Sequence, residues 1–210
     1  MRHLIKLLPL LILSACASNP AAIKQQQTNA AKWLNGQHSH VDLYVTKDGV
    51  AHYGSGVVIE QGGEKFILTC AHVVPADWGD AQMGVGHSPR AFYMGALEII
   101  KHNPERDLAL IRIAHNLQHV EAATLAAKKP VLGDVVVVHG NPNGQCNITT
   151  FGRVGSVRGS VIVTDAAVMG GNSGGGMYHN GELVGIVKEG FQHGLSIATD
   201  IEHIRTFLND

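Results

Sequence analysis

One segment of the chain places a serine inside a run of glycines. Residues 170–176 have the sequence GGNSGGG, with Ser173 at the centre. A serine hydroxyl that attacks a carbonyl needs a base for its proton and donors for the oxyanion that forms. Glycine lets the backbone fold tightly enough for the N–H groups of Gly171 and Ser173 to point into one small cavity. Because most glycine-flanked serines lie in ordinary loops, this segment alone does not establish a nucleophile.

Two upstream segments supply the other groups that such chemistry requires. Residues 66–74, FILTCAHVV, form a strand-like run that leads to His72, and residues 106–113, RDLALIRI, place Asp107 at the start of a second strand. A histidine takes the proton from the serine, and an aspartate orients the histidine. Taken singly, the three residues are an ordinary histidine, a surface aspartate and a loop serine. In this order they predict a His72–Asp107–Ser173 triad.

These segments resemble those of the chymotrypsin/trypsin-like serine peptidases, and within them the bacterial HtrA-type (Deg) branch. The resemblance covers roughly residues 40–205, the protease domain only, and rests on the sequences TCAH, DLAL and GNSGG. Residues 138–144 are similar to a loop of the second barrel, and residues 183–187 to the strand beside the specificity pocket. The resemblance implies a serine-type endopeptidase with a polypeptide substrate and no cofactor.

The fold class implied by the resemblance is all-β: two six-stranded antiparallel β-barrels, chymotrypsin-like, with a short C-terminal helix. Abundant glycine (25 residues) and few aromatic residues (5%) suit a chain with many tight turns. First-barrel strands are expected at 41–45, 53–60, 65–70, 81–85, 92–100 and 108–113. After a crossover at 122–132, second-barrel strands are expected at 135–139, 148–157, 161–165, 177–178, 183–187 and 195–198. The apolar spacing of Ile201, Ile204 and Phe207 predicts a helix over 200–208.

Alignment with the family also suggests a substrate pocket. It places Ala167 and Val168 at the base of the pocket and Gly190 and Gly194 on its walls. No acidic residue falls at the base, so we expect a small or medium apolar side chain before the scissile bond rather than lysine or arginine.

Two residues depart from the family pattern beside this pocket. Lys188 and Glu189 follow Val187, where animal members carry a serine and an aromatic residue. Lys188 either points to solvent or pairs with Asp107. Glu189 either makes the substrate groove acidic or faces water.

The first residues of the chain have the features of an export signal. A basic leader (1–6) precedes an apolar run (7–13) that is too short to span a membrane as a stable helix. The sequence LSAC at 13–16 resembles the bacterial lipobox, which implies cleavage before Cys16 and lipidation of that cysteine. The alternative is an ordinary signal peptide with an incidental cysteine.

The expected organisation follows from this signal. Residues 1–15 are a lipoprotein signal peptide, 16–37 a lipidated cysteine with a flexible tether, and 38–210 the peptidase domain. Ala17 after the cysteine implies, by the rule for Gram-negative lipoproteins, an outer-membrane anchor that faces the periplasm. Acyl chains would hold the protein at the bacterial cell envelope through Cys16.

Composition and the remaining residues narrow the partners. A formal net charge of −1 gives no electrostatic case for nucleic acid. His38 with His40, and His115 with His119, are pairs without the three or four converging ligands that zinc requires, so no metal is expected. A disulfide between Cys70 and Cys146 stays open, since an exported chain permits it and geometry can forbid it.

Three hypotheses for the function remain. The leading one is a membrane-tethered serine endopeptidase that hydrolyses exported proteins. The alternative is a non-catalytic, protease-like lipoprotein that binds peptides or a partner protein. The third, a chaperone-like quality-control role, rests on analogy with the HtrA branch alone.

Overall fold

The computed structural model describes residues 35–47, 49–74, 82–88, 91–96, 98–112, 118–190 and 194–210. These residues belong to one compact unit, Trp33–Asp210. The expected signal peptide and Cys16 lie outside the described residues. None of the helices in the described ranges is long and apolar enough to cross a membrane.

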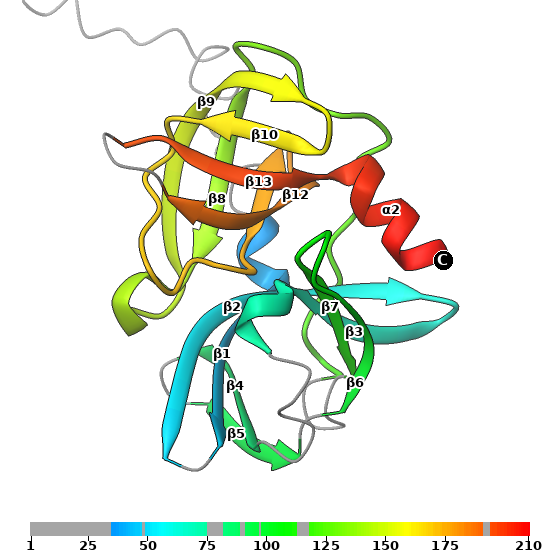
Figure 1. Ribbon diagram of the computed structural model, residues 1–210, viewed down its shortest axis with the longest axis vertical. Coiled ribbons are helices and arrows are strands. Elements are labelled where there is room, and N and C mark those ends of the chain that lie inside the picture. Colours follow the sequence, from blue (N-terminus) through cyan, green and yellow to red (C-terminus); the bar gives the residue numbers. More distant parts are fainter. Residues whose placement is uncertain are drawn as a thin grey trace, which may run out of the picture. The chain divides into compact units, whose positions relative to one another are not determined.

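The first half of the unit is a seven-stranded antiparallel sheet (Figure 1). Its strands are β1 (His40–Lys47), β2 (Val50–Gln61), β3 (Glu64–Thr69), β4 (Gln82–Ser88), β5 (Ala91–Ala96), β6 (Ile99–Asn103) and β7 (Leu108–Arg112). They are ordered β5-β4-β1-β2-β3-β7-β6. Short 3-10 helices, η1 (Asn35–Ser39) and η2 (Ala71–Val73), precede β1 and follow β3.

The strand count of this sheet differs from the six that the sequence predicts. The single strand expected at 92–100 is two strands, β5 and β6. β5 pairs with β4 and β6 pairs with β7, which lie toward opposite edges of the described sheet. One continuous strand cannot pair with both neighbours, so the chain breaks around Glu98.

The second half is a closed six-stranded barrel, as expected from the sequence. Its strands are β8 (Val135–Gly140), β9 (Ile148–Arg158), β10 (Val161–Thr164), β11 (Gly176–His179), β12 (Glu182–Gly190) and β13 (Ser196–Asp200). Their order around the barrel is β10-β13-β12-β11-β8-β9. The 3-10 turn η5 (Pro142–Gly144) lies between β8 and β9.

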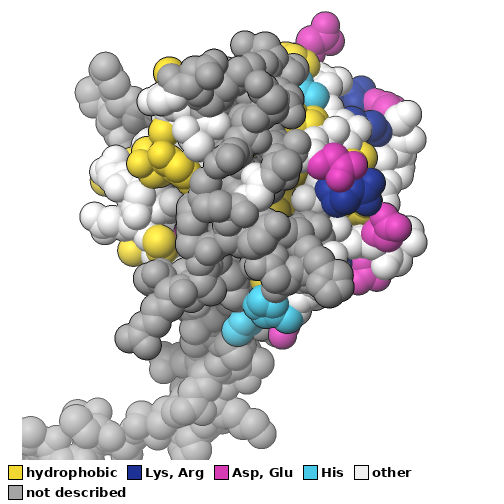
Figure 2. All heavy atoms as spheres, turned by 90° about the horizontal axis from the view of Figure 1, so that it is seen from below, with side chains coloured by type: hydrophobic (Ala, Val, Ile, Leu, Met, Phe, Trp, Pro, Cys, Tyr) yellow, Lys and Arg dark blue, Asp and Glu magenta, His cyan; other side chains and the backbone are white. Residues whose placement is uncertain are grey.

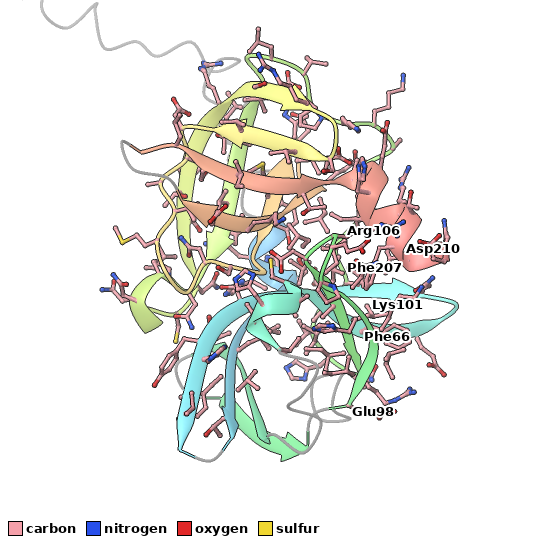
Figure 3. All side chains as sticks on the ribbon, viewed as in Figure 1. Phe66, Glu98, Lys101, Arg106, Phe207 and Asp210 are labelled. Carbon is pink, nitrogen blue, oxygen red and sulfur yellow. The ribbon has the colours of Figure 1, made fainter. Side chains whose placement is uncertain are left out.

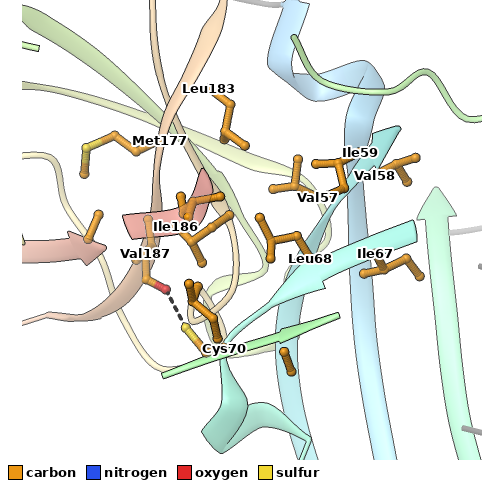
Figure 4. Packing of buried hydrophobic residues seen from close by; sticks show 14 of the residues in the cluster. Val57, Val58, Ile59, Ile67, Leu68, Cys70, Met177, Leu183, Ile186 and Val187 are labelled. Atoms are coloured by element: carbon orange, nitrogen blue, oxygen red, sulfur yellow. Dashed lines mark hydrogen bonds between the residues drawn. The ribbon is translucent and has the colours of Figure 1, made fainter. Parts of the chain in front are cut away.

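One hydrophobic core serves both halves. Residues 54–59 of β2 are all buried, so this strand is covered on both faces rather than on one. Val57 and Leu68 from the sheet belong to the same buried cluster as Leu183 and Ile186 from the barrel (Figure 4). The two halves therefore meet through packed side chains, and residues at their junction have fixed positions.

The C-terminal helix α2 (Ile201–Asn209) forms where the sequence predicts it. Asp200 caps its N-terminus by accepting a hydrogen bond from the backbone N–H of His203 (3.0 Å). Ile201, Ile204 and Phe207 recur at a spacing of three residues and are buried.

Side chains of the first sheet hold the last turn of α2. Gln61 donates to the carbonyl of Leu208 (2.9 Å), and Lys101 donates to that of Phe207 (2.7 Å). Arg106 pairs with Asp210 at the end of the chain (Figure 3). The helix packs on the barrel strands β12 and β13 and is bonded to the first sheet, so it links the two halves.

Candidate active site

His72 lies on η2, directly after β3 ends. The neighbouring Ala71 and Val73 are buried, which directs the His72 side chain outward, where 51% of it is exposed. The register of β3 and β7 sets Thr69 opposite Ala109. The end of β3 therefore lies next to the start of β7, and Asp107 immediately precedes that start.

Asp107 is the last residue of a turn that two hydrogen bonds stabilise. Its N–H donates to the carbonyl of Pro104 (3.2 Å), and Asn103 accepts from the N–H of Arg106 (2.9 Å). Asp107 has φ of 54°, in the left-handed region that non-glycine residues rarely adopt. Such strain is typical of residues whose orientation serves a site.

His72 and Asp107 are in direct contact. The Nδ1 atom of His72 lies 2.9 Å and 3.0 Å from the two carboxylate oxygens of Asp107. The backbone N–H of His72 also donates to Oδ1 (3.1 Å). A proton on Nδ1 satisfies this carboxylate and leaves Nε2 as the acceptor, the tautomer that a general base requires.

The pKa of Asp107 lies below its usual value. Burial acts to raise the pKa, but hydrogen bonds from the ring and backbone of His72 and the positive charges of His72 and Lys188 outweigh burial. The carboxylate is therefore ionised at neutral pH and able to stabilise an imidazolium.

The turn around Ser173 is possible only with glycine. Gly171 has φ of 98°, and a Cβ atom there would lie 2.2 Å from the carbonyl oxygen of Asn141. Gly174 has φ of 86°, and its Cβ would lie 2.1 Å from the carbonyl oxygen of Ser55. Both the backbone conformation and the lack of space exclude a side chain.

Two backbone N–H groups of this turn are available as donors. The carbonyl of Gly170 accepts from the N–H of Asn143 (2.7 Å), and in a trans peptide the N–H of Gly171 points the opposite way. Within the described ranges, neither the N–H of Gly171 nor that of Ser173 donates to another group. These are the two groups that the sequence predicts as the oxyanion hole.

Ser55, a residue that the sequence analysis did not select, anchors this turn. Its N–H donates to the carbonyl of Ser173 (2.8 Å), and its hydroxyl donates to that of Gly171 (2.8 Å). The same hydroxyl accepts from the N–H of Asn141 (2.9 Å). The signal available in the sequence was a serine between two glycines in a strand-like segment.

The hydroxyl of Ser173 donates to the carbonyl of Lys188, at 2.9 Å. This hydrogen bond turns the hydroxyl toward β12 rather than toward His72. The Lys188 side chain lies with Nζ 3.9 Å from Oδ2 of Asp107 and is 26% exposed. Of the two orientations expected for Lys188, the structure shows the one that pairs with Asp107, whereas Glu189 is exposed to solvent.

The four residues expected around the substrate pocket have different surroundings in the structure. Gly190 lies against Val168, because a Cβ on Gly190 would come within 2.6 Å of the Val168 carbonyl oxygen. Gly194 has open space around it. Ala167 lines a cavity of about 250 Å³ beside the connection between β8 and β9. The cavity is lined by Pro142, Asn143, Gln145, Ile148, Thr150, Ala167, Met169 and Asn172.

Cys70 lies behind His72 in the core. Its thiol donates to the carbonyl of Val187 (3.1 Å; Figure 4), and burial, followed by the charge of Asp107, raises its pKa well above the usual value. The ligand atoms of Cys70, His72 and Asp107 lie within 4.8 Å of one another. A thiol held in its protonated form and the nearby ammonium of Lys188 make this donor set unsuited to a cation.

The remaining cysteine and histidine expectations are resolved as follows. Cys70 and Cys146 are both free thiols. His38 lies in η1 and is exposed, whereas His40 is buried in β1 beside Asp42 (2.9 Å), so these two histidines do not share a strand. His115 lies outside the described residues.

Charged side chains are mixed on the face shown in Figure 2, where acidic and basic groups lie next to one another. Among the described residues, Arg112 donates to Glu98 (2.8 Å) and lies 3.7 Å from Glu64. This mixture of charges agrees with the formal net charge of −1.

The closed barrel, the second antiparallel sheet and the short C-terminal helix define a chymotrypsin-like fold of the HtrA type, which confirms the fold class expected from the sequence. Residues 54–186 match the family described as "Trypsin-like peptidase domain". The chain therefore belongs to the family of trypsin-like peptidase domains.

Similar proteins agree with this membership. "Serine protease HTRA2, mitochondrial" of Drosophila virilis is 28% identical over 211 residues, which cover 94% of this chain and 46% of that protein. The Drosophila erecta protein of the same name is 28% identical over 217 residues, with the same coverage of 94% and 46%. This chain thus spans less than half the length of these curated relatives.

Solved structures give the same result. "HtrA-type protease AlgW with tripeptide" has a TM-score of 0.74 and 27% identity, covering 85% of this chain and 62% of that one. The serine endoprotease from Yersinia pestis has a TM-score of 0.73 and 25% identity, covering 85% and 65%. The family and the relatives are those of trypsin-like serine proteases, in agreement with the enzyme class expected from the sequence, a serine-type endopeptidase with a trypsin-like fold.

Proposed function

We propose that this chain is a serine endopeptidase that hydrolyses peptide bonds of exported proteins through His72, Asp107 and Ser173. The observation that carries the proposal is the contact between His72 Nδ1 and the Asp107 carboxylate at 2.9 Å, in a chain of the trypsin-like peptidase family. This contact prepares Nε2 of His72 as the base, and the His72 side chain is half exposed.

The proposed reaction begins with the hydroxyl of Ser173. It leaves the carbonyl of Lys188 by rotation about χ1, gives its proton to Nε2 of His72 and attacks the substrate carbonyl. His72 then returns the proton to the leaving amine. In the second half, His72 takes a proton from a water molecule, which attacks the acyl-enzyme and releases Ser173. Asp107 stabilises the imidazolium in both halves and remains ionised.

The N–H groups of Gly171 and Ser173 would bind the oxyanion of each tetrahedral intermediate. Preorganised donors of this kind contribute about 3 kcal/mol each to transition-state stabilisation. The anchoring of the turn by Ser55 and Asn143 supports this role, because it fixes the direction of the donors before substrate arrives.

We further propose that lipidated Cys16 tethers the enzyme to the bacterial envelope, at the outer membrane facing the periplasm. The support for this anchor is the LSAC sequence at 13–16 and the short apolar run before it. Metabolic labelling with a palmitate analogue, compared with Cys16→Ala, tests the anchor separately from the activity.

A fluorophosphonate tests the activity of the full-length protein. This reagent phosphonylates only an activated serine, so mass spectrometry should find one adduct on Ser173, and none in Ser173→Ala. His72→Ala should reduce labelling strongly while leaving Ser173 present. Absence of an adduct on folded wild-type protein would contradict the proposal and favour a protease-like binding protein.

A further inference from the structure

Lys188 occupies an irregular position in β12. The pairing of β12 with β13 sets Val187 opposite Ala198 and Glu189 opposite Ile197, so Lys188 is the extra residue of a β-bulge. A bulge removes one residue from the ladder and redirects its side chain and carbonyl. The flanking Val187 is held in place, since its carbonyl accepts from the N–H of Gly174 (2.8 Å) and its N–H donates to Gly175 (2.8 Å).

The redirected residue contacts two members of the proposed triad through different groups. Its backbone carbonyl accepts from the hydroxyl of Ser173 (2.9 Å). Its ammonium lies 3.9 Å from Oδ2 of Asp107 and forms no other ion pair within the described ranges. Replacement of the side chain therefore removes the charge while the backbone acceptor of Ser173 remains.

The charges around His72 show what this ammonium does. Titratable groups reach His72 and its turn from four directions: Asp107 from the turn before β7, Cys70 from the end of β3, His102 from β6 and Lys188 from β12. Asp107 is the anion of the set, and the Cys70 thiol is held neutral by burial. Lys188 is the cation that offsets the carboxylate.

We infer that Lys188 is a positioning residue of the active site, whose ammonium shares the Asp107 carboxylate with His72 and keeps the His72 base free of its proton at lower pH. The inference rests on the proposed function for its consequence in catalysis. A positive charge beside the His–Asp pair disfavours a second positive charge on the imidazole. Without the ammonium, Asp107 would favour the imidazolium more strongly, and the base would be lost at a higher pH.

The test is the pH dependence of fluorophosphonate labelling by the full-length protein. In Lys188→Met, the acid side of the rate profile should move upward by about 0.5–1 pH unit. Lys188→Gln should behave alike, and it guards against an effect of the methionine side chain on folding. Lys188→Arg should restore the wild-type profile, since it keeps the charge. Lys128→Met is the matched control, because Lys128 is exposed and makes no described contact with the triad.

A second readout does not depend on activity. NMR of ring-labelled histidine, with the His72 signal assigned by its loss in His72→Gln, follows the titration midpoint of the His72 ring in each variant. The inference predicts the same upward displacement in Lys188→Met and none in Lys128→Met. Identical midpoints and rate profiles in wild type and Lys188→Met would overturn it, even if Ser173 is labelled normally. Displaced midpoints in a protein that is never labelled would instead support the charge relationship and contradict the peptidase activity.

Discussion

The hydroxyl of Ser55 donates a hydrogen bond to the carbonyl of Gly171 at 2.8 Å, although the two residues lie 116 positions apart in the chain. Ser55 belongs to β2 of the first sheet, and Gly171 belongs to the turn that presents Ser173 from the barrel. The backbone of Ser55 binds Ser173 directly as well, at 2.8 Å. The geometry of the turn that carries Ser173 is therefore set jointly by both halves of the fold.

Ser55→Ala should slow labelling of Ser173 more than it unfolds the protein. The change leaves the carbonyl of Gly171 and the N–H of Asn141 without a partner, which costs about 1–2 kcal/mol of unfolding free energy. Labelling should slow by about 10-fold, because the proposed oxyanion donors lose their fixed direction. Rate constants with a fluorophosphonate and urea denaturation measure the two effects.

Ser196→Ala provides the matched control for that change. Ser196 is also buried and donates to one carbonyl, that of Ala166 (2.9 Å), but it has no described contact with the turn around Ser173. It should lose similar stability and keep the labelling rate. Equal rates in the two variants would show that Ser55 supports the fold and not the site.

Gly174→Ala should destabilise the protein by about 3–4 kcal/mol. The new Cβ would lie 2.1 Å from the Ser55 carbonyl oxygen and 2.1 Å from Thr69 Oγ1, at a φ of 86°. Gly62→Ala separates the two causes, since Gly62 has φ of 63° with nothing within 4 Å of the Cβ position. Conformational strain alone predicts about 1 kcal/mol for Gly62→Ala in urea denaturation. A similar small loss in Gly174→Ala would mean that the turn tolerates a side chain.

Asp200 should make stability depend on acid pH. Burial acts to raise the pKa of Asp200, but hydrogen bonds from Lys129 and His203 outweigh it and hold the pKa below its usual value. A carboxylate whose pKa is lower in the folded state adds stability above the unfolded pKa of about 3.9, and this stability is lost as pH falls through the folded value. Asp200→Asn should therefore cost about 2 kcal/mol at pH 7 and progressively less below pH ~4.

The exposed partner of the same lysine gives the comparison. Glu202 also pairs with Lys129 (2.9 Å), but its side chain is 63% exposed. Glu202→Gln should change stability by less than about 0.5 kcal/mol at any of these pH values. A constant difference between wild type and Asp200→Asn from pH 7 to pH 3 would contradict the role of the charge.

The cysteines should react as two free thiols of different accessibility. Iodoacetamide under denaturing, non-reducing conditions should alkylate both Cys70 and Cys146, whereas a disulfide would protect both. In native protein, Cys146 should react before Cys70, because Cys70 is fully buried and burial raises its pKa well above the usual value. Peptide mapping by mass spectrometry distinguishes the two sites. Rapid native labelling of Cys70 would show that the core behind His72 opens.

The sequence predicts the barrel better than the sheet, and the reason is physical. Each of the strands β8 to β13 overlaps one strand predicted from the sequence. In the first sheet, residues 92–100 are apolar enough for one long strand, but β5 and β6 pair with different neighbours. Periodicity reports which face of a strand is buried and does not report which strand pairs with it.

In the site, too, local motifs could be read from the sequence, whereas long-range partners could not. The order of His72, Asp107 and Ser173 follows from local motifs, and the structure brings His72 and Asp107 into contact. Ser55 could not be assigned, because its role depends on a partner 116 residues away. The sequence left two orientations of Lys188 open, because a long side chain reaches solvent or a carboxylate equally well. The β-bulge that decides between them is a property of the pairing with β13.

The ion pair between Arg106 and Asp210 connects the last turn of α2 to the turn that holds Asp107. Arg106 is the residue directly before Asp107, and Lys101 of β6 is bonded to the same helical turn. Fraying of α2 would release both side chains and free the strained turn to relax while the barrel is still intact. We expect this local opening around Asp107 to cost less free energy than global unfolding. Hydrogen exchange at the end of α2 would report the fraction of folded molecules in which the Asp107 turn is ordered.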